Sequence, residues 1–431
     1  MVSLLHTYSY ILKPLQGAIM KHYNTIIIGA GPSGLCCSYH LKEAGIEHLI
    51  LEKDTLLHTW KNERWDSFNL VTPNWMTRLP GMEDSTPSNN EFMTKQEIVD
   101  VLEAFAKGIN PTILEHTSVR EINQEDTTFK LETNHGSFSA DHVIVSIGLF
   151  NTPKIPECSK HVPDSILQLH SVDYKNPSQL KEGNALVIGA GRSGVQIAYE
   201  IKKDTPRDVW LALGTLRPIP PIYAFTNGVY WLNRLSGFTH FNDSIPYKTS
   251  DTNNQNIMSK MVQNLGGCVK LGITLTGRFN GYSDNGFYFE PNLHDALEAG
   301  KTYMTQFEKE ISNHIQDHDL SVSHEQSPLD LPELQKHNLE ETAFLSKDTC
   351  NIKNIIWCTG FKPDYSWIHL NVFDSNGYPI HSHGKTDING LYFTGLSLDP
   401  GFGGTSGFGI GLFAIAEDAK RVVSDIIQIS K

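Results

Sequence analysis

Two glycine-rich turns carry residue types and a spacing that could bind phosphate. The first runs from Gly29 to Gly34 with the sequence GAGPSG, and the second from Gly189 to Gly194 with the sequence GAGRSG. Glycine lets the backbone turn tightly and approach a pyrophosphate, and a helix that starts behind the turn offers unpaired N–H groups and a partial positive charge. The residues that we assign to these two phosphate sites are Gly29, Gly31, Ser33, Gly34, Gly189, Gly191, Arg192, Ser193 and Gly194.

Each turn needs a strand before it and a helix after it, because glycines alone occur in many kinds of turn. The apolar residues 24–28 precede the first turn, a helical stretch follows it, and residues 48–51 form the next predicted strand. In the same way, residues 185–188 precede the second turn and its helix, and residues 209–213 follow as a strand. The sequence therefore predicts two strand–helix–strand units of the kind that bind dinucleotides.

The residue that closes the second strand of each unit indicates which nucleotide is bound. Glu52 closes it in the first unit, where a carboxylate can accept hydrogen bonds from a ribose diol, as in the adenosine of FAD; we assign its neighbour Lys53 to the same site. In the second unit, Ala212 stands at the corresponding position and Arg217 follows. Because no carboxylate repels a 2′-phosphate there, NADPH is favoured over NADH. Arg217 is then either the phosphate partner or a solvated loop cation, and Arg192 either faces the cofactor phosphates or lies on the surface.

The remaining elements complete an α/β chain. Short strands are predicted over residues 118–122, 129–133 and 142–147, and a buried strand over 355–357. Residues 292–317 predict a helix with one apolar stripe. The last helix starts within residues 405–411, where small residues would let its N-terminus approach the pyrimidine ring of a flavin; a packed glycine-rich loop is the alternative.

We expect two Rossmann-like dinucleotide-binding domains, with the NAD(P)-binding domain inserted into the FAD-binding domain. The FAD-binding domain is expected over residues 21–165 and 350–431. The NAD(P)H-binding domain, with its helical insertion, is expected over residues 176–345. Residues 1–20 are expected to be a disordered tail, or in part the product of an upstream mis-called start.

Composition and charge exclude other classes of protein. The 431 residues carry a formal net charge of −13 and no cluster of Lys and Arg, which argues against a nucleic-acid partner. The six cysteines are scattered without a C-x-x-C pair, so we expect neither a disulfide framework nor a metal site, and a cytoplasmic location. The sequence contains no apolar run of the roughly 18 residues that a membrane span needs.

Several segments together resemble the flavin-containing monooxygenases and their bacterial relatives, from about Tyr23 to the end of the chain. These segments are residues 60–68 (WKNERWDSF), 70–75 (LVTPNW), 79–81 (LPG), 170–175 (HSVDYK), the second glycine turn, and 356–364 (IWCTGFKPD). The last segment resembles the linker strand of the family, with Cys358 in place of the usual Ala. We accordingly assign Thr359 and Gly360 to the cofactor site, together with Gly395.

The resemblance also has departures. Asp164 and Ile166 stand where the family's identifying motif has Phe and Gly. Typical members carry an Asn directly after the Thr of the loop on the flavin side, whereas this chain has Pro73 there and Asn74 one position later. These departures concern the oxygenation reaction. The binding of FAD and of a nicotinamide nucleotide is predicted from the two glycine turns independently of the resemblance.

The resemblance implies an FAD-dependent, NADPH-using monooxygenase. NADPH would reduce FAD, the reduced flavin would meet O2, and a C4a-(hydro)peroxyflavin would transfer oxygen to a small organic substrate. Asn74 and Asp66 are the candidate catalytic residues, Asn74 at the flavin edge and Asp66 holding a cofactor or substrate group. Trp60, with Trp65 and Trp75, would keep water from the flavin ring. Alternatively, Asn74 is an ordinary turn residue, Asp66 caps a turn in a loop, and the tryptophans belong to the core.

Rival functions remain open. One is an NAD(P)H-dependent flavoprotein oxidase or reductase; a disulfide reductase would need a redox-active cysteine pair, and the adjacent Cys36 and Cys37 cannot act as a C-x-x-C couple. Another is a nucleotide-sensing flavoprotein that regulates a partner without turning over a substrate. For the enzyme we expect a small molecule and O2 as partners, and the chain could form a homodimer.

Overall fold

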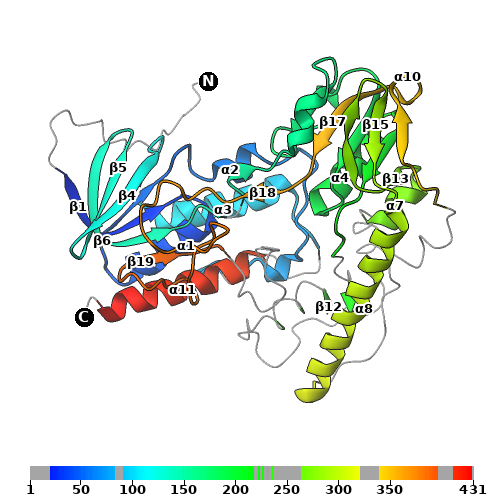
Figure 1. Cartoon of the computed structure of the whole chain (residues 1–431). Helices are drawn as coiled ribbons and strands as arrows, with labels where there is room; N and C mark the ends of the chain where they lie inside the picture. The colour runs from blue at the N-terminus through cyan, green and yellow to red at the C-terminus, as the bar shows by residue number, and fades with distance from the viewer. Residues whose placement is uncertain are drawn as a thin grey trace, which may run out of the picture.

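The computed structural model describes residues 20–82, 91–148, 150–217, 264–320, 339–396 and 411–429, together with residues 222–223, 226–227, 231 and 235. Apart from Met20, the tail expected over residues 1–20 falls outside these ranges, and so does most of the expected start of the last helix. Figure 1 shows two lobes, each built round a sheet. None of the helices in the described ranges combines the length and the apolar character needed to cross a bilayer.

The first sheet has the strand order β3-β2-β1-β6-β5-β4, with β19 also paired to β6. Its strands are β1 (Lys21–Ile28), β2 (His48–Leu51), β3 (Ile113–Leu114), β4 (Val119–Glu125), β5 (Thr128–Thr133), β6 (Gly136–Val145) and β19 (Leu391–Phe393). β1 runs parallel to β2 and β6, with Ile27 opposite Ile50 and Ile144, and β19 runs parallel to β6. The carboxyl ends of β1, β2, β6 and β19 therefore lie at one edge, where open α/β sheets bind ligands.

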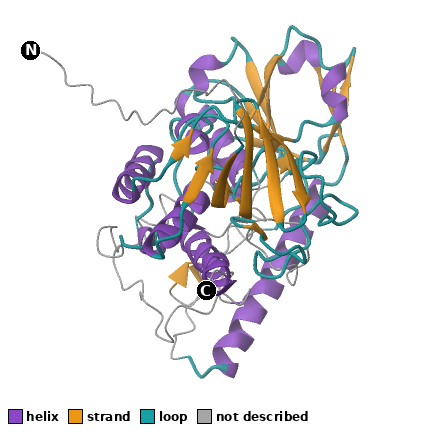
Figure 2. Cartoon of the chain, turned by 90° about the vertical axis from the view of Figure 1, so that its left-hand side faces the viewer, coloured by secondary structure: helices purple, strands orange, loops and turns teal. Residues whose placement is uncertain are grey.

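Alternation along these strands divides the core into two layers. Ile27, Ile50 and Ile144 pack on one face with helices α1 (Pro32–Glu43), α3 (Lys95–Ile109) and α11 (Gly411–Ile429). The residues directly before and after these three in each strand point to the other face, where they pack against residues 365–372. Seen from the side of this lobe, helices lie beside the layer of strands (Figure 2). Burial of apolar side chains on both faces explains why the central strands read as continuous apolar runs.

The second sheet is entirely parallel, with the order β13-β10-β9-β17-β8. Its strands are β8 (Leu167–His170), β9 (Asn184–Ile188), β10 (Val209–Ala212), β13 (Thr274–Thr276) and β17 (Ile352–Trp357), and helices α4 (Arg192–Asp204) and α7 (Leu265–Lys270) pack on it. The expected boundaries need correction here, because they start this domain at residue 176 and give residues from 350 to the first domain. β8 and β17 are strands of the second sheet, which a short apolar run alone cannot reveal.

A smaller antiparallel sheet extends the second lobe. It consists of β14 (Phe279–Ser283), β15 (Gly286–Phe289) and β16 (Phe344–Ser346), with α10 (Lys347–Cys350) after it. The helix expected over residues 292–317 is confirmed as α8 (Leu293–Asp317), which extends away from the sheets in Figure 1. The other short elements are α2 (His58–Asn62), β11 (Ile222–Tyr223), β12 (Thr226–Asn227) and the 3-10 helices η1 (Asn74–Met76), η2 (Glu157–His161) and η3 (Pro177–Gln179).

The chain crosses between the sheets through one ribbon of two short strands. β7 (Thr152–Pro153) leaves the first sheet, β18 (Phe361–Lys362) returns to it, and the two pair antiparallel with Phe361 opposite Pro153. All strands of the second sheet come from the sequence between them. The expected insertion of one α/β domain into the other is thereby confirmed, and Figure 1 shows α2 and β18 between the two sheets.

Candidate cofactor and active site

The first glycine turn follows β1 and packs tightly against the end of β6. Gly29 has a φ of +106°, and a β-carbon there would lie 2.7 Å from the carbonyl oxygen of Ser146. A β-carbon on Gly34 would lie 2.0 Å from the carbonyl oxygen of Gly29. These two positions therefore require glycine for reasons of packing and backbone conformation.

Gly31 differs from its neighbours, because no atom of the described residues lies within 4 Å of the place its β-carbon would take. It directly precedes α1, whose first N–H groups have no side-chain cap. An uncapped helix N-terminus beside open space is the geometry that receives a phosphate. The residues of this turn thus fit the pyrophosphate of a dinucleotide.

Glu52 is held beside the same turn. Its Oε2 accepts a hydrogen bond of 2.7 Å from the N–H of Ala30, and its Oε1 one of 2.9 Å from the N–H of Asp54. Because a carboxylate oxygen has a second lone pair, both atoms can still accept from a ribose diol. Lys53 is exposed and lies 3.8 Å from the carboxylate of Asp54, so its cofactor role stays a prediction.

Three buried hydroxyl groups join the strand ends below the turn. Thr394 Oγ1 accepts a bond of 2.7 Å from Ser33 Oγ and lies 2.8 Å from Ser146 Oγ. Gly395 follows with a φ of +70°, and a β-carbon there would lie 3.1 Å from Ser33. Ser33 and Gly395 are thus brought together at the start of α1. Ser146 and Thr394 were not among the predicted residues, although each is the first polar residue after an apolar strand.

The second turn repeats the geometry of the first. Gly189 has a φ of +104°, and its β-carbon would lie 2.3 Å from the carbonyl oxygen of Cys358, at the end of β17. A β-carbon on Gly194 would lie 1.7 Å from the carbonyl oxygen of Gly189 and 3.2 Å from Cβ of Cys358. At Gly191, by contrast, the described residues again leave the space within 4 Å open. The residues present fit a second dinucleotide, whose phosphates would face Gly191 and the start of α4.

No carboxylate stands beside this second turn at the position that corresponds to Glu52. β10 ends at Ala212, whose carbonyl accepts a bond of 3.0 Å from the N–H of Gly189, as the carbonyl of Leu51 accepts one from Gly29 in the first unit. The expected correspondence is therefore wrong by one residue: the buried Leu213, and not Ala212, stands at the position of Glu52. Arg217 is exposed a few residues later. Arg192 and Ser193 open α4. The contacts of these three side chains with a nucleotide stay predictions.

Thr359 and Gly360 lie where the chain leaves the second sheet. The carbonyl of Gly360 accepts bonds of 3.0 Å from the N–H of Lys154 and of 3.0 Å from Nε2 of His170. The hydroxyl of Thr359 donates to the carbonyl of Lys154. Burial lowers the pKa of His170, which favours a neutral ring in this contact. These residues tie the crossing ribbon to the second sheet.

Asp66 joins the two lobes. Its Oδ2 accepts a bond of 2.7 Å from Asn176, and its N–H donates a bond of 2.8 Å to the carbonyl of Lys175. Lys95 adds a contact of 3.7 Å to its other oxygen. Because Asp66 already has these protein partners and is exposed, its contacts support a positioning role, and the catalytic role stays a prediction.

Asn74 and Trp60 both belong to the first lobe. Asn74 begins η1, is only 6% exposed, and donates its N–H to the carbonyl of Glu91 at 2.8 Å. Trp60 is partly buried, with its ring 6.2 Å from that of Phe68. Trp65 and Trp75 are both buried, and Trp65 packs into the core of the second lobe. The alternative that these tryptophans are core residues therefore fits Trp65 and Trp75.

The cysteine thiols of this protein are all free. All six cysteines lie in the described ranges. Burial raises the pKa of Cys37 to about 12 and that of its neighbour Cys36 as well. A thiolate is therefore disfavoured on α1. Within the same ranges, no group of three His, Cys, Asp or Glu side chains gathers in the manner of a metal site.

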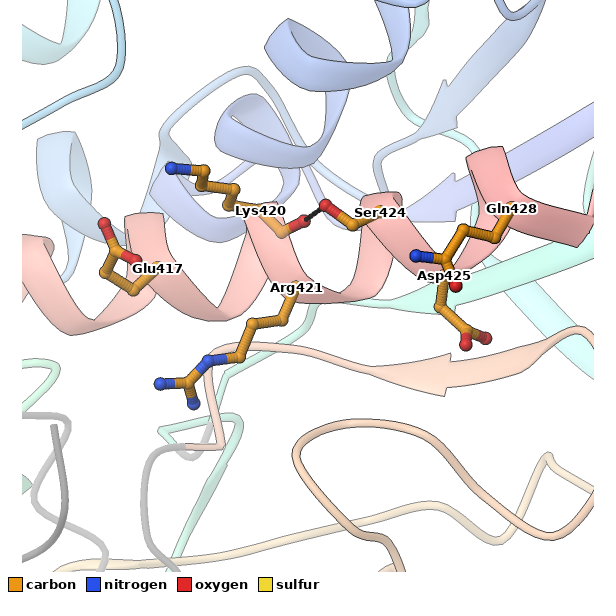
Figure 3. Close-up of a pocket in the computed structure, with 6 residues that line it drawn as sticks. All are labelled: Glu417, Lys420, Arg421, Ser424, Asp425 and Gln428. Carbon is orange, nitrogen blue, oxygen red and sulfur yellow. Dashed lines mark hydrogen bonds between the residues drawn. The ribbon is translucent and has the colours of Figure 1, made fainter. Parts of the chain in front are cut away.

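A shallow hollow on α11 is separate from both turns. Its lining residues all belong to that helix: Glu417, Lys420, Arg421, Ser424, Asp425 and Gln428 (Figure 3). Asp425 already accepts bonds from Tyr392 and Lys385, at 2.7 and 2.9 Å. The hollow is therefore a polar helix surface without any residue of the glycine turns.

Comparisons with known proteins cover the region that contains both turns. A family model described as pyridine nucleotide-disulphide oxidoreductase matches residues 26–211, which contain both turns. An uncharacterized CzcO-like oxidoreductase of Geobacillus kaustophilus is 31% identical over 414 residues, 95% of this chain and 100% of that protein. A probable indole-3-pyruvate monooxygenase of Arabidopsis thaliana, YUCCA1, is 27% identical over 210 residues, 48% of this chain and 50% of that protein.

Solved structures show the same architecture. The flavin-containing monooxygenase from Stenotrophomonas maltophilia aligns with a TM-score of 0.62 and 17% identity, over 96% of this chain and 100% of that chain. At that identity the likeness concerns the fold. Because the relative from Geobacillus kaustophilus matches along its whole length, the chain belongs to the CzcO-like oxidoreductases and has the two-domain α/β fold of flavin-containing monooxygenases.

Proposed function

We propose that the protein is an FAD-dependent monooxygenase that uses NADPH and oxygenates a small organic substrate. The observation that carries this proposal is the pair of matching turns, each closed by packing at two glycines and open at the third. The open positions are Gly31 in the first domain and Gly191 in the inserted one. When bound, FAD would accept hydride from NADPH and activate O2 as a C4a-(hydro)peroxyflavin that gives one oxygen atom to the substrate.

The residues of the first turn would hold the FAD. The N–H groups at Gly31 and the start of α1 would bind the pyrophosphate, and the carboxylate of Glu52 would accept from the ribose hydroxyls. Its two backbone donors fix that carboxylate before any ligand arrives, so little ordering remains on binding. FAD is thus the dinucleotide that this side of the molecule supports best.

The second turn supports NADPH over NADH. The apolar Leu213 stands where a carboxylate would repel a 2′-phosphate, and Arg217 is an exposed cation a few residues later. A direct test is Leu213→Glu, which should shift the preference toward NADH by reinstating the ribose acceptor. Unchanged preference in a folded variant would count against this assignment.

Oxygen transfer rather than peroxide release depends on keeping water from the flavin. Asn74 is buried and is our candidate for a hydrogen bond near the reacting oxygen. Trp60 is partly buried and is our candidate for an aromatic wall that keeps water out. The relatives named as monooxygenases support this choice over an oxidase. The six free cysteines and the raised pKa of the adjacent Cys36 and Cys37 count against a disulfide reductase. We further propose that the protein is cytoplasmic and that it forms a homodimer.

The deciding experiment mixes the NADPH-reduced holoenzyme with O2 in a stopped-flow spectrometer. A monooxygenase should form a long-lived oxygenated flavin before reoxidation, most clearly with NADP+ bound. Reoxidation in a single step at several pH values, with one peroxide released per NADPH, would instead show an oxidase. NADPH binding without turnover would show a nucleotide sensor.

A further inference from the structure

Arg64 lies among three aromatic rings at the junction of the two lobes. Its guanidinium carbon is 5.4 Å from the centre of the Trp60 ring, 5.8 Å from that of Phe68 and 5.8 Å from that of Phe150. Trp60 belongs to α2, and Phe68 follows in the same segment, whereas Phe150 comes from the loop after β6. The rings thus fix the place of a cation with side chains from distant parts of the sequence.

The guanidinium of Arg64 has no hydrogen-bond acceptor or ion-pair partner among the described residues. A guanidinium carries five N–H donors, and Arg64 is only partly buried. Arg207 in the second lobe shows the usual arrangement, since it donates to the carbonyls of Leu180, Lys181 and Gly183. Burial lowers the pKa of Arg64, and the charge of Glu63 partly opposes that effect without forming an ion pair. Arg64 is therefore a partly buried cation whose donors are not used by any described residue.

The aromatic rings round Arg64 belong to a cluster that reaches strand ends of both sheets. The ring of Phe150 lies 5.2 Å from that of Phe361, which in turn lies 5.0 Å from that of His170. Phe150 follows the carboxyl end of β6, Phe361 follows that of β17, and His170 ends β8. The aromatic cluster round Arg64 therefore lies where the carboxyl ends of the two sheets meet, near α2 and β18 in Figure 1.

We propose that Arg64 binds an oxyanion, a carboxylate or a phosphate, of the ligand that enters between the two sheets. A planar guanidinium pairs with either group through two parallel hydrogen bonds. The oxyanion has two sources, the organic substrate itself or the nicotinamide nucleotide. The proposal rests on the proposed function only in placing a ligand between the sheets, and binding measurements test it without any turnover. A purely structural role, in which the rings alone hold the cation, is the alternative.

The test compares Arg64→Gln with the wild-type holoenzyme in equilibrium titrations with benzoate and with NADP+, followed by the flavin absorbance spectrum. Benzoate is chosen as a carboxylate with an aromatic body that suits the surrounding rings. Loss of a charge-assisted pair should raise the dissociation constant of the affected ligand about ten- to a hundredfold. Arg120→Gln, at an exposed position on β4, is the matched control for loss of one positive charge.

The two sources give different results. Weaker benzoate binding with unchanged NADP+ binding would assign the oxyanion to the substrate, and weaker NADP+ binding would assign it to the nucleotide. If both dissociation constants stay at the wild-type values while the variant keeps its flavin and melting temperature, the proposal is overturned. Should Arg64→Gln fail to fold, Arg64→Lys replaces it: that variant keeps the charge but loses the fork, so it should bind the affected ligand several-fold more weakly, and wild-type binding of both ligands would again overturn the proposal.

Discussion

Replacing Gly31 by Ala should separate cofactor binding from folding. Gly31 has φ and ψ of −82° and −177°, an extended conformation that any residue adopts, and its β-carbon would meet no described atom within 4 Å. The free energy of unfolding of the apoprotein should therefore change by less than about 1 kcal/mol. Gly34→Ala is the contrasting variant, because its β-carbon would lie 2.0 Å from a backbone oxygen, and it should lose several kcal/mol or fail to fold.

The same β-carbon at position 31 would occupy the space that a phosphate needs. Loss of one charge-assisted hydrogen bond costs about 1.5–3 kcal/mol, so the Kd for FAD should rise about ten- to a hundredfold. The assay is quenching of FAD fluorescence as apoprotein is added. Gly191→Ala makes the matched change at the second turn and should weaken NADP+ binding while leaving the Kd for FAD unchanged. Wild-type FAD affinity in Gly31→Ala would refute the assignment of the first turn.

Three further predictions concern the nucleotide, the oxygen reaction and pH. Arg217→Ala should raise the KM for NADPH about ten- to a hundredfold and leave that for NADH nearly unchanged; equal losses would transfer the role to Arg192 or another residue. Asn74→Ala should leave flavin reduction by NADPH nearly intact but increase peroxide release, and an unchanged ratio of peroxide to NADPH consumed would contradict this. Burial, opposed by Arg421, raises the pKa of Asp418 from 3.8 to about 6, so its ionisation destabilises the folded protein as the pH rises through that interval. Asp418→Asn should therefore gain up to about 3 kcal/mol in urea unfolding at pH 7 and less at pH 5; the same gain at both pH values would rule out this explanation.

Local patterns predicted the parts of the site that depend on neighbouring residues. A turn between a strand and a helix is set by glycines and apolar residues close in sequence, so both turns and the place of Glu52 beside Ala30 followed from the sequence. The long helix α8 followed for the same reason, since its apolar stripe repeats along one segment.

Pairing between distant segments could not be read in this way. The strand β17 shows an apolar run, but nothing in that run says that its neighbours are β8 and β9. The hydroxyl group of Thr394 likewise meets Ser33 only because β19 pairs with β6. Arg64 stood inside a segment that carried the family resemblance, yet its aromatic surroundings include Phe150, whose proximity depends on the fold of the whole lobe.

The pairing of β7 with β18 brings both covalent connections of the inserted domain together in one ribbon. Because Pro153 lies opposite Phe361, the two cut ends of the first domain would be only about 5 Å apart, a gap that a two-residue hairpin turn can close. Excision of residues 154–360 would leave every strand of the first sheet in place. The excised protein would expose Trp65, which packs into the lost core, so polar replacement of that residue would be needed for solubility. One nucleotide site could thus have been added to, or exchanged within, an ancestral flavin-binding domain without altering its topology.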